Sequence, residues 1–402
     1  MKRRDFLRST GWFVIGATLV GIPTLDGCGD NTKQQLPDAG SGSDADPSGT
    51  YQFPQGVASG DPRDTSVVLW TRVVRGSDAT AEVAVTVQVS TEASFATVVA
   101  SKMVSAGAAS DHTVRALITG LSAATSYYYR FVAGQDAITG QTRTAPAATA
   151  DVQVNLAWVS CQDYAAGNYG AYRQMLIDDA ARADADKLHA VVHLGDMIYE
   201  TRGDGFQTAI DDNFTPIALK NRDGSQRGVP AFPSGGGTRD GVSGQFAKTV
   251  DDYRSLYRTF LSDPDLQAAR ARWPFVAVWD DHEFTDDCWQ SQANYTDDKS
   301  LDEGDQTRRA AASQAWFEYV PALLTGAPGV AGVPSQAKDF AAPMPGVTDA
   351  QFPQTVTAEN FVNEPNNVAA VGAISIYRSL RFGKHVELVM TDLRSYRSDH
   401  AI

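Results

Sequence analysis

The chain has 402 residues, of which 43% are hydrophobic and 20% are charged, a composition that is typical of globular proteins and excludes collagen-like and disordered chains. Its formal net charge is -14, and no stretch carries the dense basic patch that binding to nucleic-acid phosphates requires, so we expect no nucleic-acid partner. Three cysteines are too few for a disulfide framework.

The first segment, residues 1–27, has the pattern of an export signal, because a basic start precedes an apolar run that is shorter than the roughly 20 residues of a membrane-spanning helix. The paired Arg3 and Arg4 before Phe-Leu resemble the twin-arginine signal, which predicts the twin-arginine translocase as a partner. An ordinary secretion signal is the alternative. The run ends at Cys28 in a sequence that resembles a lipobox, so Cys28 is either a lipid anchor or lies beside a simple cleavage site. We therefore expect an exported protein of the periplasm or cell envelope.

Two segments with a different rhythm follow. Residues 28–50 are rich in Gly, Ser, Asp and Pro, which predicts a flexible tether. From residue 51 to residue 147, short apolar or alternating runs are separated by turn residues and show no helical period. This pattern predicts an N-terminal all-β sandwich of the fibronectin or immunoglobulin kind.

Residues 148–402 are predicted to form an α/β domain. Residues 154–159 and 188–194 are predicted strands that flank a helix within residues 167–185, and this β-α-β order is typical of layered α/β folds. Further predicted elements are strands at 275–279 and 386–391, a helix over 251–271 and a long surface excursion over 202–250.

Polar side chains follow each predicted strand of this domain. In chain order they are Cys161 after the first strand, Asp196 and Tyr199 after the second, Asp281 and His282 after the third, and Arg394 and Arg397 after the last. Because ligand sites of open α/β sheets form outside the carboxyl ends of the strands, we expect these side chains to gather in one site. Singly, each has an ordinary explanation, such as Cys161 being a small buried apolar residue.

The expected site concentrates carboxylates that would raise one another's pKa unless cations were bound. Hard oxygen ligands suit Ca²⁺, Mg²⁺ or Mn²⁺, a thiolate prefers iron or zinc, and a tyrosine beside a thiolate favours Fe³⁺. We therefore expect more than one metal, of more than one kind. Such metals beside arginines suit phosphoryl transfer, with His282 as the proton donor to the leaving alkoxide and Arg394 or Arg397 on the non-bridging oxygens.

Six ordered blocks of the sequence resemble the PhoD-like alkaline phosphatases. They are Phe53–Pro62, Val67–Arg72, Ser160–Gln162, Gly195–Glu200, Trp279–Glu283 and Asp392–Arg397. The resemblance implies an α/β/β/α metallophosphoesterase sandwich after the β-sandwich, a site with one Fe³⁺ and Ca²⁺ ions, and an exported hydrolase that releases phosphate from phosphate esters by a metal-activated water. It places Cys161 and Tyr199 on iron, makes Asp196 bridge to calcium and puts Asp281 on the second metal. It does not decide between Asp286 and Asp287 for a further calcium ligand, and Asp287 is the candidate kept.

One departure from the family is the early end of the chain. The family continues beyond the last block with further Asp and His metal ligands, whereas this sequence stops at Ile402, so we expect a truncated second domain with an incomplete metal site. Asp399 and His400 follow the arginine block too closely to replace those ligands. Two alternatives to the phosphatase reading are a phospholipase-D-like phosphodiesterase for phospholipid or teichoic-acid diesters and a non-catalytic envelope binding protein. We expect a monomer, without a disulfide between Cys161 and Cys288.

Overall fold

The computed structural model describes residues 51–76, 80, 82–203, 207–238, 244–293, 303–324, 345–351, 355–358 and 361–399. The predicted export signal, the tether, Cys28 and His400 lie outside the described residues. Within the described residues, no helix combines the length and the apolar character that crossing a bilayer would need.

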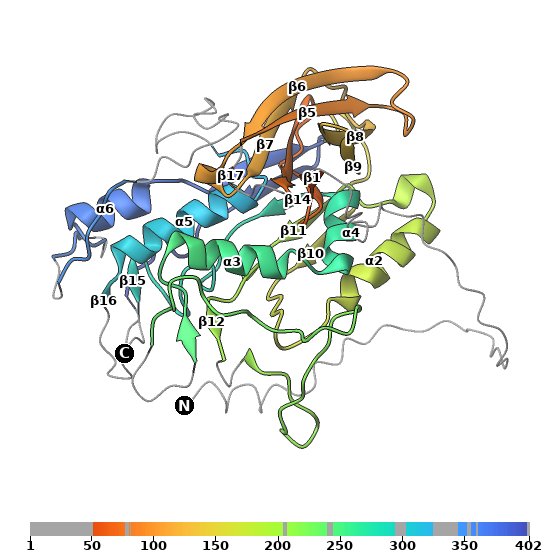
Figure 1. Ribbon diagram of the computed structural model, residues 1–402. Coiled ribbons are helices and arrows are strands. Elements are labelled where there is room, and N and C mark those ends of the chain that lie inside the picture. The colour runs from red at the N-terminus through yellow and green to blue at the C-terminus, as the bar shows by residue number, and fades with distance from the viewer. Residues whose placement is uncertain are drawn as a thin grey trace, which may run out of the picture. The chain divides into compact units, whose positions relative to one another are not determined.

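A four-stranded antiparallel sheet dominates the first part of the chain. Its strands, in sheet order, are β6 (Val98–Ala106), β5 (Val83–Ser90), β8 (Ser126–Ala133) and β9 (Asp136–Arg143). Along β5, Val83, Val85, Val87 and Val89 are buried and alternate with more exposed residues, as expected for a strand with one face on a core. This sheet lies uppermost in Figure 1.

A six-stranded sheet runs through the centre of the molecule and contains strands from both halves of the described chain. In sheet order it consists of β10 (Leu156–Val159), β11 (Ala190–His193), β14 (Pro274–Ala277), β2 (Val57–Gly60), β3 (Ser66–Arg72) and β7 (Thr113–Thr119). The first four strands are parallel to one another, whereas β3 pairs antiparallel with both of its neighbours, β2 and β7. Ser59 of β2 pairs with Pro274 of β14, so this sheet joins strands from both sides of the domain boundary that was predicted at residue 147.

Two apolar cores lie on the two faces of the shared strands. Val57 and Leu69 belong to the core that is enclosed with the four-stranded sheet, whereas their chain neighbours Ala58 and Trp70 belong to the core of the α/β part. Alternation along β2 and β3 therefore serves both cores at once. The core of the first part of the chain therefore lies between the four-stranded sheet and strands that also belong to the six-stranded sheet.

Among the residues that the structure describes, five helices belong to the α/β part. They are α2 (Gly170–Ala181), α3 (Val250–Phe260), α4 (Pro264–Arg272), α5 (Gln306–Tyr319) and α6 (Pro365–Gly372). The single helix predicted over residues 251–271 is wrong, because the chain breaks into α3 and α4. Asp263 caps the second helix by accepting hydrogen bonds from the amides of Asp265 and Leu266, and Pro264 occupies its first turn.

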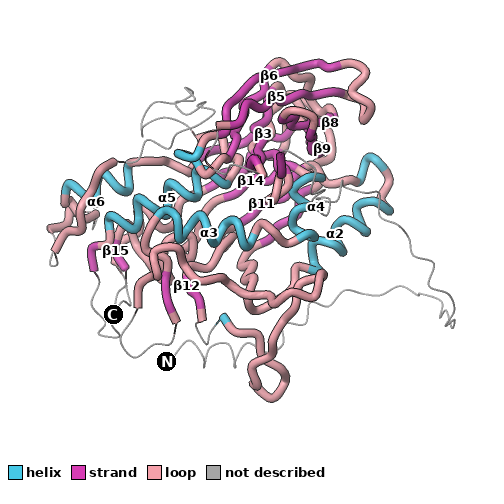
Figure 2. The backbone as a smooth tube through the Cα atoms, viewed as in Figure 1, coloured by secondary structure: helices cyan, strands magenta, loops and turns pink. Residues whose placement is uncertain are grey.

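The remaining strands form short two-stranded pairs. The pairs are β1 (Tyr51–Gln52) with β4 (Val74–Arg75), β12 (Thr201–Arg202) with β13 (Gln245–Phe246), β15 (Gln292–Ala293) with β16 (Glu303–Gly304), and β17 (Arg378–Phe382) with β18 (Val386–Met390). Single 3-10 turns lie at Ala108–Ser110 and Asp184–Asp186. The described residues between β12 and β13 are mostly loop, as the pink tube in Figure 2 shows, in agreement with the predicted excursion.

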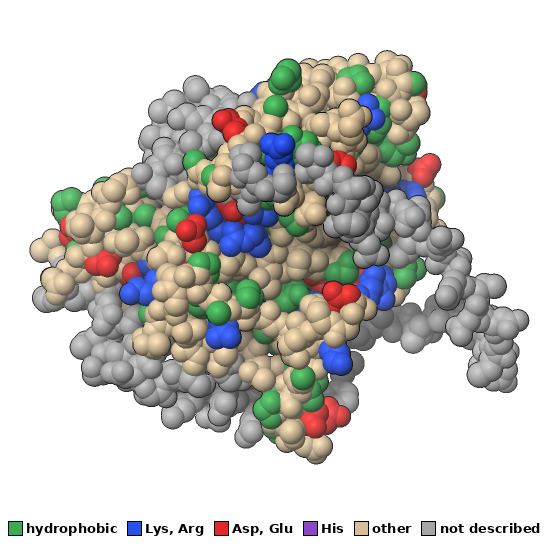
Figure 3. Space-filling model, viewed as in Figure 1, with side chains coloured by type: hydrophobic (Ala, Val, Ile, Leu, Met, Phe, Trp, Pro, Cys, Tyr) green, Lys and Arg blue, Asp and Glu red, His purple; other side chains and the backbone are tan. Residues whose placement is uncertain are grey.

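Charged side chains tie the first part of the chain to the helices. On the face drawn in Figure 3, acidic and basic side chains lie in small groups of both signs. In one such network Asp111, which follows the first 3-10 turn, accepts from Arg72 at 3.1 Å and from Arg258 of α3 at 2.5 Å. Arg254 of the same helix binds Glu318 of α5 through two bonds of 2.7 Å.

The end of β2 is fixed by an ion pair that is closed off from water. Arg378 of β17 donates to the two carboxylate oxygens of Asp61 at 2.6 and 2.7 Å, and their side chains are 1% and 0% exposed. Asp61 also accepts from the amide of Leu323 at 2.6 Å, and Arg378 donates to the carbonyl of Ala277 at 2.9 Å. One pair of side chains thus joins β2, β14, β17 and the segment after α5.

We expect Asp61→Asn to lower the free energy of unfolding by about 3 kcal/mol, because the substitution leaves the Arg378 cation buried without its counter-charge. The exposed neighbour Asp64 provides the matched control, and Asp64→Asn should change the stability by less than about 0.5 kcal/mol. Urea denaturation of the two variants measures the difference. Equal midpoints would mean that the ion pair does not stabilise the fold.

Candidate functional site

The loops that follow β10, β11 and β14 meet at one edge of the sheet. The amides of Cys161 and Gln162 donate to the carbonyls of Gly195 and Asp196, at 3.2 and 3.1 Å, so the first two loops are joined directly through their backbones. Cys161 and Asp196 both adopt left-handed backbone conformations, with φ of 57° and 56°. Such conformations cost roughly 1 kcal/mol or more for a residue with a side chain and concentrate at functional sites.

A thiol, a phenol and a carboxylate converge where these loops meet. The thiol of Cys161 lies 3.3 Å from Oδ2 of Asp196, to which it donates, and the Tyr199 hydroxyl is hydrogen-bonded to the same thiol. Burial, together with Asp196, raises the pKa of both the thiol and the phenol. The structure therefore brings together the three side chains that the sequence analysis assigned to iron.

Carboxylates continue the site toward the third loop. Ligand atoms of Asp196, Asp281 and His282 lie within 4.8 Å of one another, and so do those of Asp281, Asp286 and Asp287. Burial and the charges of neighbouring carboxylates raise the pKa of Asp196 and of Asp286 to about 6, although His282 acts in the opposite direction on both. Asp281 belongs to both groups and so occupies the centre of the acidic cluster. A cation would relieve the repulsion that raises these pKa values.

The third loop also holds its own residues in place. Asp287, which has a φ of 53°, donates its amide to Oδ2 of Asp281 at 2.7 Å. The next residue in the chain, Cys288, is completely buried. Cys161 and Cys288 are both free, so the expected absence of a disulfide between them holds.

His282 lies between the acidic cluster and a buried glutamate. Its Nδ1 is 2.7 Å from Oε2 of Glu200, its Nε2 is 3.6 Å from Oδ1 of Asp286, and its ring lies against that of Tyr199 with 4.2 Å between centroids. Burial lowers the pKa of His282, but Glu200 and then Asp281 more than offset this effect and raise it to about 10. The Nδ1 side of the ring therefore faces Glu200, and the Nε2 side faces Asp286.

Glu283 connects the second and third loops through its side chain. Its carboxylate accepts from the amides of Asp196 at 3.1 Å, Met197 at 2.7 Å and Asp280 at 2.8 Å. Burial and the charge of Asp196 raise the pKa of Glu283 to about 8, against the lowering effect of these three bonds. The sequence analysis gave no role to Glu283 or to Glu200. Both stand inside the strand-end blocks, but nothing in a sequence shows which of several adjacent carboxylates turns inward.

The two predicted arginines lie in different surroundings. Arg394 donates to Asp280 at 2.6 Å, lies 3.4 Å from Oδ2 of Asp281 and donates to the carbonyl of Cys288 at 3.3 Å, so its guanidinium is engaged with the third loop. Arg397 is half-buried, its carbonyl accepts from Gln290 at 3.0 Å, and among the described residues its guanidinium has no ion-pair partner. The structure therefore brings Arg394, but not the charge of Arg397, into contact with the acidic cluster.

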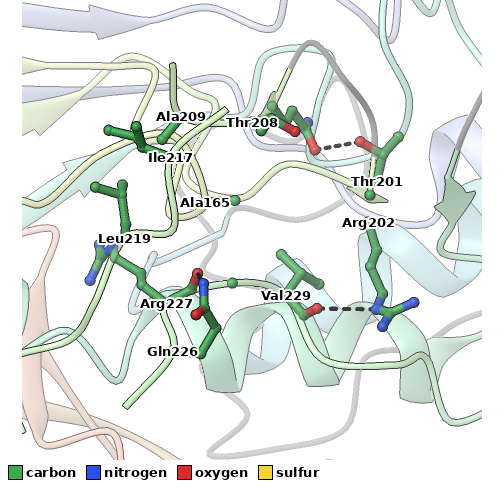
Figure 4. A pocket seen from close by; sticks show the side chains of 13 residues that line it. Ala165, Thr201, Arg202, Thr208, Ala209, Ile217, Leu219, Gln226, Arg227 and Val229 are labelled. Atoms are coloured by element: carbon green, nitrogen blue, oxygen red, sulfur yellow. Dashed lines mark hydrogen bonds between the residues drawn. The ribbon is translucent and has the colours of Figure 1, made fainter. Parts of the chain in front are cut away.

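A cavity of about 290 Å³ adjoins the site on the side of the excursion. Thr201, which directly follows Glu200, lies in its wall, as does Ala165 of the loop that begins at Cys161. Figure 4 shows Ile217 and Leu219 on one side of the cavity and Arg202 on the other, where Arg202 donates to the carbonyl of Val229 at 3.2 Å. None of the predicted site residues lines this cavity.

The chain is similar to known proteins along most of its length. The pattern of the PhoD-like phosphatase family matches residues 156–402, and that of the PhoD-like phosphatase N-terminal domain matches residues 39–146. Alkaline phosphatase D of Bacillus subtilis (strain 168) is 31% identical over 334 residues, which are 81% of this chain and 49% of the relative. A solved structure of PhoD shares 28% identity with a TM-score of 0.59 over 87% of this chain and 53% of the other. The chain thus spans about half the length of the curated relative that it matches.

We expect Glu283→Gln to lower the free energy of unfolding by about 1–3 kcal/mol, because an amide has one oxygen for three donors and presents an N–H₂ group to the remaining amides. The matched control is Glu387→Gln on β18. Glu387 is exposed and forms a surface ion pair with Arg381 at 3.6 Å, and such a pair contributes less than about 1 kcal/mol to the stability. Urea denaturation compares the two variants. Equal stability would contradict the role of Glu283 in joining the loops.

Proposed function

The chain belongs to the PhoD-like phosphatase family, and from this premise we propose that it is an exported, metal-dependent hydrolase that releases phosphate from organic phosphate esters. The observation that supports the proposal most is the convergence of Cys161, Asp196, Tyr199, Asp281 and His282 at the carboxyl ends of three parallel strands. A binding protein would have no need for a thiol, a phenol and a buried acidic cluster at one edge. This convergence therefore favours the enzyme over the non-catalytic alternative.

The chemistry of the donor set fits two kinds of cation. Cys161 and Tyr199 offer a thiolate and a phenolate, which suit Fe³⁺, and Asp196 lies beside both. Asp281 and Asp287 offer carboxylate oxygens, which suit Ca²⁺. We propose that these residues hold the metals, with Asp196 shared between them. When bound, such ions supply a hydroxide nucleophile from water and neutralise the charge that develops on the phosphoryl oxygens.

The residues of the chain then supply the proton and the orientation. His282 is the general acid, and it gives the proton on Nε2 to the oxygen of the leaving alkoxide as the bond between phosphorus and that oxygen breaks. Arg394 is engaged with Asp280 and Asp281, so we assign it to holding the acidic cluster in place. Arg397, whose guanidinium is not committed to a carboxylate among the described residues, is the candidate for the non-bridging oxygens of the substrate.

We also propose export through the twin-arginine route. The support is the sequence of residues 1–27 with its Arg3–Arg4 pair, and the relation of Cys28 to a lipobox leaves a lipid anchor as part of the proposal. Edman sequencing and mass spectrometry of the exported protein would find either a lipidated Cys28 or an unmodified cleavage site.

We expect His282→Asn to lower kcat for an alkyl ester by about 10²–10⁴-fold, because the alkoxide then leaves without a proton donor. Phosphate release from glycerol 2-phosphate, with iron and calcium supplied, measures this loss. His385→Asn is the matched control, since His385 is exposed and pairs only with Asp151 at 2.9 Å. An unreactive wild-type protein would contradict the proposed function, and an active His282→Asn variant would contradict the role of His282.

We expect Cys161→Ser to lose iron and the visible tyrosinate absorption, whereas Cys288→Ser should keep both because Cys288 is a buried thiol outside the proposed ligand set. Elemental analysis and absorption spectroscopy of the purified variants provide the measurement. A chelator should also lower the unfolding temperature of the wild type, because ions that bind only the folded state stabilise it. Equal iron content in the two variants would contradict the assignment of Cys161 as an iron ligand.

A further inference from the structure

We propose that Glu200 is a positioning residue that fixes the imidazole of His282, with the Nδ1 proton directed to Glu200 and Nε2 directed to the reacting ester. The inference rests on the proposed function for its catalytic consequence, but the contact itself is independent of that function. The carboxylate of Glu200 is completely buried, and its Oε2 lies 2.7 Å from Nδ1 of His282.

Both oxygens of Glu200 are engaged, which restricts the rotation of its carboxylate. Its Oε1 accepts from the amide of Asp286 at 3.0 Å, while Oε2 faces the imidazole. The imidazole is held on a second side by the ring of Tyr199, at 4.2 Å and an angle of 33°. A ring that is held by a hydrogen bond at one edge and by an aromatic ring on its face has little freedom to flip.

The backbone of Glu200 is itself fixed by the ribbon at the base of the excursion. Its carbonyl accepts from the amide of Ala247 at 2.9 Å, and the next residue, Thr201, begins β12 and pairs with Phe246 of β13. The end of the excursion therefore fixes the backbone of Glu200, whose side chain in turn contacts His282. This gives the described parts of the long segment between β12 and β13 a role in the geometry of the catalytic centre.

The chemistry of a general acid makes this contact useful. When the bond between phosphorus and the ester oxygen breaks, its electron pair stays on that oxygen, which takes the proton from Nε2. The imidazolium becomes a neutral imidazole that keeps its proton on Nδ1, where the carboxylate of Glu200 continues to accept it. Glu200 gains no proton, and its role is to select this tautomer and this orientation.

A purely structural role is the competing explanation, since Glu200 also accepts from the turn at Asp286. The two explanations differ in how the loss depends on the leaving group. A residue that acts through the proton donor matters most when the leaving alkoxide is strongly basic, whereas a residue that only holds the loop affects all esters alike.

The first experiment compares Glu200→Gln with wild type on two esters. We expect kcat for glycerol 2-phosphate to fall by about 10–100-fold with little change in KM, and kcat for 4-nitrophenyl phosphate, whose leaving group needs no proton, to fall less than about threefold. The variant Glu387→Gln should leave both unchanged. The loss should also vanish in the His282→Asn background, because Glu200 acts through that ring. Equal losses for the two esters, or losses that multiply in the double variant, would overturn the proposal.

The second experiment reads the contact without any activity. In the ¹H–¹⁵N spectrum of the full chain prepared without iron, whose paramagnetism would broaden the signal, we expect a slowly exchanging Nδ1–H signal of His282. The signal is assigned by its absence in His282→Asn, and it should disappear in Glu200→Ala. A signal that persists in Glu200→Ala would overturn the proposal. If the signal depends on Glu200 but the wild type hydrolyses no phosphate ester, the proposed function fails while the positioning contact stands.

Discussion

The site depends on one buried carboxylate. Glu283 belongs to the third loop but accepts two of its three hydrogen bonds from the second, so a buried side chain sets the distance between Asp196 and the residues after β14. A glutamate suits this task because the two oxygens of its side chain can accept several amide hydrogen bonds at once. Asp196, whose amide is one of the three donors, has a left-handed backbone conformation, which persists only where the surrounding structure holds it.

The concentration of negative charge explains much of what surrounds the site. Burial and the charge of Asp281 raise the pKa of both Asp196 and Asp286, and His282 offsets only part of this effect. Tight loops, buried glutamates and an engaged arginine hold together groups that would otherwise separate. Part of the chain's excess of acidic residues is therefore concentrated at one edge of the six-stranded sheet.

The sequence was sufficient to locate polar side chains that directly follow a predicted strand. The blocks that contain Cys161, Tyr199 and His282 could be located because polar residues interrupt apolar runs, and the rule for open α/β sheets indicates where they meet. Strand pairing was not accessible in the same way. Nothing local in Ser59 indicates that its neighbour across the sheet is Pro274, because pairing between distant segments is decided by the global fit of the sheet. The break before α4 was visible in Asp263 and Pro264, but the apolar period across it hid the signal.

The pairing of β2 with β14 also bears on how the chain folds. β2 is synthesised early, but its partner appears only after both α2 and the excursion have been made, so the central sheet is dominated by contacts between residues far apart in sequence. Folds with such a high contact order form slowly, since a large loop must close before the pairing is rewarded. Because β2 and β3 present alternate residues to both cores, neither core can be completed without the other, and the two should melt in one cooperative transition.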